Sequence, residues 1–421
     1  MEYPFNSEDD ITNAIEDVNE YRELYQQHLK KQHEENAEFL REDPWYVEAI
    51  KLEYHYFELY AWAVKHVTIS DAWGIISIRE STLSEQYYLG IDVAPDKSES
   101  VLIDGRMFLE RQSVRCIISL KQYDVIQVAA GTENADAVKE VIQEIETYAK
   151  ENNFYRGQKL DFNGKLSFIK AGHQDWDEIV LDPVMKEQIR QNTTGFITNT
   201  DQWKRYGIPV KRGIILGGDP GTGKTLVCKA LISEADGMTC IVTDSICMAN
   251  PKLIIALFSI ADTLSPALII IEDIDMIGME RDIFSPSAPP LLTLLAVMDG
   301  ITEKQNIITV GTTNSIDKLD KTLRERPSRF DRIFFFARPD NNKRAQILRN
   351  QAKTIPMSEE LIEYIAQKTS QYTPAQLKEI VYGMVISRVS TSRDIVDLSI
   401  DDADRVISQM EVSRKNKIGF S

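Results

Sequence analysis

The chain has 421 residues, of which 43% are hydrophobic and 27% are charged, and its formal net charge is -17. This length exceeds what one hydrophobic core usually serves, so two to four domains of ordinary soluble composition are predicted. The acidic balance disfavours binding to nucleic acid or to anionic membranes, because residues 1–70 hold sixteen acidic side chains against six basic ones.

The N-terminus is acidic and polar, and it carries no predicted targeting signal. It reads MEYPFNSEDD, whereas a signal peptide needs a basic start followed by an apolar stretch. The sequence contains no run of about 18 apolar residues, the length that a membrane helix needs. The four cysteines lack metal-type spacing and mostly fall in apolar segments. We therefore expect a cytoplasmic protein with reduced, buried thiols and without a membrane span.

Residues 1–70 are predicted to form an acidic helical segment rich in aromatic side chains. Apolar residues recur at three- and four-residue steps from 10 to 40, and a second helical stretch is predicted from 44 to 67. The aromatic residues of the second stretch are too many for one apolar stripe. They form either the core of a helical hairpin or a docking surface for a partner or a neighbouring subunit. Four histidines also lie here, at spacings that do not predict a metal site.

A β-rich domain with one helix is predicted from residue 71 to 172. Short β-branched and aromatic runs, separated by Gly, Asp and Pro, extend from 73 to 128. A helix follows from 135 to 152, and a short strand pair then turns at Asn163 and Gly164. We place the linker to the next domain near Gly172.

Strands and helices alternate between residues 173 and 338, which predicts a parallel sheet covered by helices. Apolar strands are predicted at 214–216, 239–242, 268–271 and 307–310, within a sheet of five strands. The intervening helices are predicted from 224, near 253–261 and near 291–298. Beyond Pro339 only helical patterns remain, so residues 339–421 are predicted to form a small helical domain.

The glycine-rich segment at 218–225 is the most specific motif of the sequence. It reads GDPGTGKT, which satisfies G-x-x-x-x-G-K-[ST], and it lies between an apolar strand and the start of a helix. The glycines let backbone N–H groups surround phosphates, Lys224 places a positive charge on the β and γ oxygens, and Thr225 offers a hydroxyl to Mg2+. A nucleoside triphosphate with Mg2+ is therefore the predicted ligand.

Three carboxylates belong to the run LIIIEDID at 268–275, which is predicted to be a buried strand and the turn after it. Because this strand end should lie beside the phosphates, one carboxylate is expected to hold Mg2+ through its water shell. Another is expected to orient the attacking water as general base. By position we assign the metal role to Glu272 and the base role to Asp273, with Asp275 as a further candidate.

Two later segments complete the predicted catalytic set. The strand IITVGTTN ends at Asn314, whose side-chain amide is expected to reach the γ-phosphate and the attacking water. The segment ERPSRFDR then brings Arg326, Arg329 and Arg332 within seven residues. In this context they resemble arginine fingers that reach the γ-phosphate of a neighbouring subunit, which would make the oligomer a condition of catalysis.

From residue 176 to 403 the chain resembles the AAA family of P-loop ATPases. The resemblance rests on GDPGTGKT, EDID, the MDG at 298–300, GTTN, SRFDR, ARPDNNKRAQIL and SIDDADRVI. It implies an α/β ATPase module with a helical lid, ATP and Mg2+ as ligands, a ring of six or seven identical subunits, and Arg329 and Arg332 as the paired fingers. It also implies that an adenine pocket forms ahead of the P-loop. The residues expected to contact the nucleotide are Gly207, Ile208, Asp219, Pro220, Gly221, Thr222, Gly223, Lys224, Thr225 and Leu226.

Within this family the chain is most similar to the branch that contains the mitochondrial translocase of the Rieske iron-sulfur protein. Both have a β-rich domain directly ahead of the ATPase and a YGIP-x-KRG approach to the P-loop. Both also place Glu before Asp in the acidic pair, where the usual family order is Asp then Glu. This chain lacks the N-terminal membrane helix of the translocase, so membrane location and a folded cargo are not carried over.

Two further departures concern the loop at 245–252 and the lid. The loop reads SICMANPK and lacks the aromatic residue with which protein-threading family members grip a polypeptide. This difference favours conformational change of the ring acting on a folded or assembling client. In the lid, the segment YTPAQLKEI predicts Thr373 as a helix cap and Pro374 as the first helical residue, without a sensor-2 arginine.

The sequence therefore predicts ATP hydrolysis in a homo-oligomeric ring that remodels, assembles or disassembles a protein client, which residues 1–172 would recognise. One alternative is a nucleic-acid-dependent motor or loader, which the acidic front and a sequence pI near 4.9 disfavour. The other alternative is a nucleotide-gated scaffold with little turnover, which the Glu-Asp order suggests.

Overall fold

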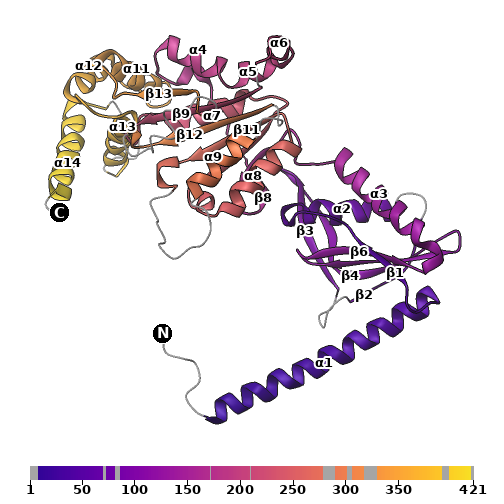
Figure 1. The fold of residues 1–421 in the computed structure, drawn as a ribbon. Coiled ribbons are helices and arrows are strands. Elements are labelled where there is room, and N and C mark those ends of the chain that lie inside the picture. Colours follow the sequence, from indigo (N-terminus) through magenta and orange to yellow (C-terminus); the bar gives the residue numbers. More distant parts are fainter. Residues whose placement is uncertain are drawn as a thin grey trace. The chain divides into compact units, whose positions relative to one another are not determined.

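The computed structural model divides the chain into two compact units, Met1–Tyr155 and Arg156–Ser421 (Figure 1). Each unit has its own sheet and is treated by itself below. The structure describes residues 8–69, 73–80, 86–170, 172–208, 210–277, 290–300, 306–316, 330–390 and 398–418.

The first unit is an antiparallel sheet with helices packed against it. Its strands run in the order β1-β6-β5-β4-β2, and β3 also pairs with β4. The strands are β1 Tyr46–Ala49, β2 Gly74–Arg79, β3 Tyr87–Ala94, β4 Lys97–Arg111, β5 Val114–Lys121 and β6 Val125–Ala130. The helices are α1 Glu8–Leu40, α2 Phe57–Ile69 and α3 Ala135–Glu151. Helix α3 buries Val138, Val141, Ile142 and Ile145 at helical spacing, so one face packs on α2 and β6.

The single helix predicted from 44 to 67 is wrong in its first part. Residues Tyr46–Ala49 form β1 because they pair antiparallel with β6, in a register that sets Tyr46 opposite Ala130. Hydrogen bonds to a neighbouring strand outweigh the local helical periodicity here, and such pairing is decided by the tertiary structure. The helix α2 begins at Phe57, after a short 3-10 turn.

The aromatic residues of this stretch pack mostly inside their own unit. Tyr56 and Phe57 are buried. The ring of Trp62 lies 5.4 Å from Tyr148 and 5.4 Å from Phe154, measured between ring centroids. This packing favours a core role over a docking role for these side chains.

The second unit is built around a seven-stranded sheet in the order β13-β9-β12-β11-β10-β7-β8. Strands β13, β9, β12, β11, β10 and β7 are parallel along this order, and β8 pairs antiparallel with β7. The bounds are β7 Lys159–Phe162, β8 Leu166–Phe168, β9 Lys211–Gly218, β10 Thr239–Asp244, β11 Ala267–Glu272, β12 Ile307–Thr313 and β13 Arg332–Phe336. The helices of this layer are α4 Pro183–Gln191, α5 Thr194–Thr198, α6 Thr200–Arg205, α7 Lys224–Glu234, α8 Pro251–Thr263 and α9 Pro290–Gly300. The inner strands β11 and β12 are buried along their length except at Glu272, as expected for a parallel sheet covered on both faces.

The strand pair that turns at Asn163 and Gly164 belongs to this second sheet and not to the β-rich domain. Strand β7 pairs with β10, and the Cys240 N–H donates a hydrogen bond to the Gln158 carbonyl at 2.8 Å. The Arg156 side chain also donates to the Thr263 carbonyl at 2.9 Å. The boundary expected near Gly172 therefore moves to Tyr155/Arg156, and the expected five-stranded sheet gains two strands.

The lid follows β13 and consists of α11 Asn341–Ala352, α12 Glu359–Lys368, α13 Pro374–Val389 and α14 Ile400–Ile418. Each of the first three helices has a side-chain cap, from Asp340, Ser358 and Thr373 respectively. The predicted cap at Thr373 is confirmed: it forms a capping box with Gln376, and Pro374 is the first helical residue. The lid helices bury their own apolar core, which includes Leu348, Ile365 and Leu377.

Two further predictions concern cysteines and membrane spans. All four cysteines are free and buried, as expected. Burial raises the pKa of the Cys228 thiol to about 12. Across the described part of the chain, no helix is both long enough and apolar enough to span a bilayer.

Candidate nucleotide-binding site

The P-loop, residues 218–225, connects the buried strand β9 to the first turn of α7. Gly221 has a φ of +78°, and a Cβ there would lie 2.8 Å from the Ala375 Cβ. Gly218 has a φ of +152°, and a Cβ there would lie 2.4 Å from the Phe336 carbonyl oxygen. Only glycine fits both positions. The loop therefore turns tightly and leaves its N–H groups at a helix N-terminus, the arrangement that favours phosphate.

Lys224 is the first residue of α7, and its ammonium group is bound inside the loop. The Nζ atom donates to the carbonyl oxygens of Gly218 at 2.6 Å and Asp219 at 3.1 Å. It also donates to Asn314 Oδ1 at 2.9 Å. Burial lowers the pKa of Lys224, and the nearby carboxylates of Asp273 and Asp219 oppose that shift. A buried cation held by neutral oxygens is suited to bind an anionic phosphate.

The carboxyl ends of β11 and β12 bring the predicted acidic and amide side chains together. Asn314 Nδ2 donates to Asp273 Oδ1 at 2.8 Å, so a continuous hydrogen-bonded chain runs from Lys224 through Asn314 to Asp273. Asp273 has a φ of +50°, a left-handed conformation that non-glycine residues rarely adopt. Its N–H donates to Thr312 Oγ1 at 3.1 Å, which holds this turn. The three residues are far apart in sequence and meet because their parallel strands end at one edge.

Glu272 is the last residue of β11 and lines the same cavity as Asp273. Burial raises the pKa of Glu272, and the negative charge of Asp273 raises it further. Asp275 lies outside the cavity lining, and its Oδ1 is buried without a hydrogen bond among the described residues. Both members of the Glu-Asp pair thus face the space where phosphates and Mg2+ are expected.

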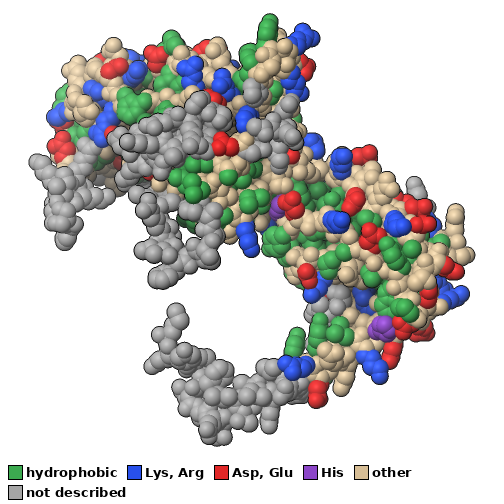
Figure 2. Space-filling view, viewed as in Figure 1, with side chains coloured by type: hydrophobic (Ala, Val, Ile, Leu, Met, Phe, Trp, Pro, Cys, Tyr) green, Lys and Arg blue, Asp and Glu red, His purple; other side chains and the backbone are tan. Residues whose placement is uncertain are grey.

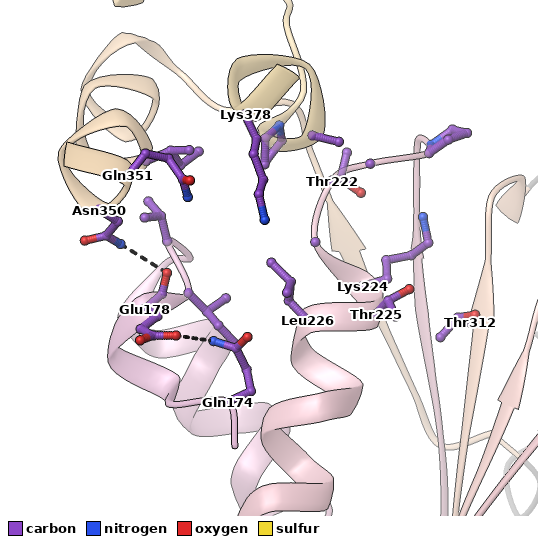
Figure 3. Close-up of a pocket in the computed structure, with 18 of the residues that line it drawn as sticks. Gln174, Glu178, Thr222, Lys224, Thr225, Leu226, Thr312, Asn350, Gln351 and Lys378 are labelled. Carbon is purple, nitrogen blue, oxygen red and sulfur yellow. Dashed lines mark hydrogen bonds between the residues drawn. The ribbon is translucent and has the colours of Figure 1, made fainter. Parts of the chain in front are cut away.

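The cavity above the P-loop has a volume of about 600 Å³, a size typical of small-molecule sites. Its floor includes Pro220 and Gly221 through Leu226, residues for which nucleotide contacts are predicted. The opposite end was not predicted from the sequence (Figure 3). That end is lined by Gln174, Glu178, Ile179, Val180, Ile347, Asn350, Gln351, Lys353, Thr354, Ala375 and Lys378.

These unpredicted residues come from the segment before α4 and from the lid. Asn350 Nδ2 donates to the Glu178 carbonyl at 3.1 Å, across 172 residues of sequence. Figure 3 shows Lys378 extending from α13 into the cavity, toward the space above Leu226. The helical spacing of Pro374, Ala375 and Lys378 is a signal that would have placed Lys378 on the cavity face of α13.

Gly207 and Ile208, expected in the adenine pocket, are not among the lining residues. They form the turn after α6, where the Ile208 N–H donates to the Trp203 carbonyl at 2.9 Å, and the Ile208 side chain is 39% exposed. Ile179 and Val180 provide the apolar surface at that end of the cavity instead. Asp219 also points away from the cavity, because its carboxylate accepts a hydrogen bond from Arg338.

The predicted arginine fingers fall partly outside the described residues, which include neither Arg326 nor Arg329. Arg332 is the first residue of β13, and its backbone pairs with β9 opposite Ile214. Its side chain is exposed and does not line the cavity of its own chain. An exposed position of this kind is available to another subunit.

The residues that the structure brings together fit ATP with Mg2+. A glycine-rich turn at a helix N-terminus, a buried lysine, an exposed hydroxyl at Thr225 and two strand-end carboxylates share one cavity. Thr225 and Glu272 would hold Mg2+, which would supply positive charge to the phosphate oxygens.

Comparison with known proteins agrees with this geometry. Residues 214–338 match the model of the ATPase family associated with various cellular activities (AAA). The chain is 33% identical over 280 residues to an ATP-dependent zinc metalloprotease FtsH of Mesomycoplasma conjunctivae, covering 63% of this chain and 37% of that protein. It is 32% identical over 263 residues to FtsH of Streptococcus pneumoniae, covering 59% and 38%. It is 29% identical over 239 residues to Protein SAV of Sulfolobus acidocaldarius, covering 55% and 30%.

The chain thus spans about a third of the length of these relatives. What the matches establish is a domain that is homologous to FtsH-type AAA proteins. Such a domain binds ATP with Mg2+ and hydrolyses ATP.

Proposed function

We propose that this AAA ATPase domain works in a ring of identical subunits and couples ATP hydrolysis to the remodelling of a protein client. The observation that carries the proposal is the chain of hydrogen bonds from Lys224 through Asn314 to Asp273, at the mouth of the P-loop. It joins the phosphate-binding cation, the amide and a carboxylate that can orient water. AAA family members typically form hexameric rings, and this supports the proposed assembly.

In the proposed reaction, Lys224 and the P-loop N–H groups bind the β and γ phosphates. Asp273 accepts a proton from the attacking water. Asn314 fixes the positions of this carboxylate and of the Lys224 ammonium group through its hydrogen bonds to both. Glu272 and Thr225 would hold the Mg2+ ion. A guanidinium from Arg329 or Arg332 of the next subunit stabilises the charge of the transition state.

Client remodelling is supported by the surface near the loop at 245–252. The segment is short and folded: the Cys247 N–H donates to Asp244 Oδ1 at 2.8 Å, and Met248 is buried. Ile246 is 83% exposed, so this loop offers one aliphatic contact and no aromatic one. Such a loop favours contact with the surface of a folded client over the gripping of an extended polypeptide. The resemblance to the translocase branch points the same way.

Recognition of the client, expected from residues 1–172, is assigned to the first unit, Met1–Tyr155, and helix α1 supports this assignment. Its second half is fixed to the sheet, where the buried Arg106 donates to Glu35 Oε2 at 2.7 Å and to Asn36 Oδ1 at 2.7 Å. Further toward the N-terminus, Tyr21 and Leu24 are 62% and 50% exposed, and Tyr25 and Leu29 continue the same helical stripe. Exposed aromatic and aliphatic groups at this spacing suit a protein partner.

Two other functions receive less support. On the face drawn in Figure 2, the Lys and Arg side chains of the described residues are interspersed with Asp and Glu and form no continuous basic stripe. This distribution does not favour a nucleic-acid motor. The 421 residues contain no H-E-x-x-H segment, so zinc-dependent peptide hydrolysis is not proposed for them.

The shared site is tested with Arg329→Ala in the full chain. We expect phosphate release per subunit to fall about 10^3-fold or more, because the finger stabilises transition-state charge. Mixing this variant with Lys224→Ala protein should restore part of the activity, since each lacks a different half of the site. Equal rates for Arg329→Ala and wild type would refute catalysis across a subunit boundary.

A further inference from the structure

Arg338 bonds to the P-loop and to the lid at the same time. It lies between β13 and α11, and its Nε donates to Asp219 Oδ2 at 2.7 Å. Its Nη1 donates to the carbonyl oxygen of Gln371 at 2.8 Å, in the turn before α13. One planar guanidinium therefore holds the second residue of the P-loop and the backbone that leads into a cavity-lining helix.

A second contact joins the same two segments. The Ala375 N–H donates to the Gly221 carbonyl at 3.2 Å. A side chain at Gly221 would collide with Ala375 and would lie 3.0 Å from Thr373 Oγ1. The first turn of α13 is thus in direct contact with the P-loop, and Lys378 lies one turn further along the same helix. If the P-loop shifts, the first turn of α13 must move with it, or the contacts made by Arg338 and by the Ala375 N–H must break.

Arg338 also neutralises the negative charge of the Asp219 side chain. A carboxylate inside a phosphate-binding loop repels the triphosphate, and an unpaired one would lower nucleotide affinity. The Asp219 main-chain oxygen accepts hydrogen bonds from Lys224 and Thr222, so its backbone is part of the cradle. Its side chain is turned away from the cavity to Arg338, which compensates the negative charge.

We propose that Arg338 is a positioning residue that neutralises Asp219 and ties the P-loop to the first turn of α13, so that nucleotide binding and the seating of the lid are coupled. This inference rests on the proposed ATPase function. It concerns the response of the site to nucleotide, and Arg338 itself does not touch the reacting atoms.

The electrostatic part is tested by a double-mutant cycle in the full chain. Affinity for Mg-ATP is measured for wild type, Arg338→Ala, Asp219→Ala and the double variant. Arg338→Ala should weaken binding about 3- to 10-fold, because Asp219 is left unpaired near the phosphates. In the Asp219→Ala background, Arg338→Ala should have little further effect on binding, because no unpaired carboxylate is left near the phosphates.

The mechanical part is tested by hydrogen exchange of residues 371–378 with and without Mg-ATP. Wild type should show nucleotide-dependent protection of these amides. Arg338→Lys keeps the charge, so its affinity should stay within about 3-fold of wild type, but a single ammonium group cannot hold both acceptors in the same way. Its nucleotide-dependent protection should therefore be reduced. Arg349→Ala, which breaks exposed ion pairs with Glu359 and Glu363 inside the lid, is the matched control and should change neither readout.

The outcomes separate this inference from the function on which it rests. Wild-type protein that binds no Mg-ATP would overturn both. Wild-type protein that binds Mg-ATP, with additive effects of Arg338→Ala and Asp219→Ala and with full protection in Arg338→Lys, would overturn the role of Arg338 alone. Thermal unfolding of each variant checks that the fold is retained.

Discussion

The two ends of the nucleotide cavity are built in different ways. Most of the phosphate end is one continuous segment, in which β9, the P-loop and the first turn of α7 position Lys224 and Thr225 through local backbone geometry. The ends of β11 and β12 add Glu272, Asp273 and Asn314 to it. The opposite end joins the segment before α4 to the lid, and the hydrogen bond from Asn350 to the Glu178 carbonyl spans 172 residues. Most residues of the first end come from the α/β part of the unit, whereas the second end is formed jointly with the lid.

This difference indicates a division of labour. The phosphate end carries the charges that bind phosphate, and its conformation depends mainly on local glycine geometry and on contacts with the first turn of α13. The assembled end combines apolar Ile179 and Val180 with lid side chains, so its affinity for the nucleoside depends on lid position. Substitutions at the two ends should therefore differ in size and in the part of ATP that they affect.

The largest effect is expected for Lys224→Ala at the phosphate end. Loss of the buried ammonium should lower phosphate release about 10^3-fold and should weaken binding of both ATP and inorganic tripolyphosphate. Nucleotide titration and steady-state phosphate release provide the measurements, with Lys343→Ala as control, since Lys343 pairs with Asp340 and does not line the cavity. Normal tripolyphosphate binding by Lys224→Ala would contradict the assignment of phosphate binding to this end of the cavity.

Asp273→Asn should be next, because it removes the proposed general base and leaves the phosphate cradle intact. We expect kcat to fall about 10^2-fold while the affinity for Mg-ATP stays near that of wild type. The same measurements on Glu272→Gln sharpen the assignment, since a metal ligand should also change the Mg2+ dependence. Turnover that is lost in Glu272→Gln and kept in Asp273→Asn would exchange the two roles.

A smaller effect is expected for Lys378→Ala, at the point where the lid reaches the cavity. Removing this cation should raise KM for ATP about 10-fold, because its ammonium group extends into the cavity toward the space above Leu226 and would attract the anionic nucleotide. Lys368→Ala is the control, since that lysine pairs with Asp404 elsewhere in the lid and does not line the cavity. An equal KM in the two variants would exclude a contact between Lys378 and the nucleotide.

The smallest effect is expected for Asn350→Ala at the assembled end. Loss of its hydrogen bond to Glu178 should weaken ATP binding about 3-fold, the typical net value of one hydrogen bond. Tripolyphosphate binding should be unchanged, because this ligand has no nucleoside to fill that end. Competition titration against both ligands measures the difference, and a parallel loss for both would contradict the division between the two ends.

Some of this molecule follows from the sequence alone. The P-loop, the carboxylates at the end of β11, the amide at the end of β12 and the cap of α13 are local patterns. Each depends on neighbours within a few residues, through hydrophobic periodicity, glycine conformation or capping chemistry. Strand order in a parallel sheet then brings the separate strand ends to one edge, which is why Lys224, Asn314 and Asp273 meet as expected.

Other features were decided only by tertiary structure. Strand β1 replaced part of a predicted helix, and the pair β7–β8 joined the ATPase sheet, because pairing with a distant strand is not encoded in local periodicity. The nucleoside end of the cavity and the bridge from Arg338 to Asp219 and Gln371 likewise join segments that are distant in the chain. Their geometry is set by how the lid packs, and packing depends on the shape of both surfaces at once.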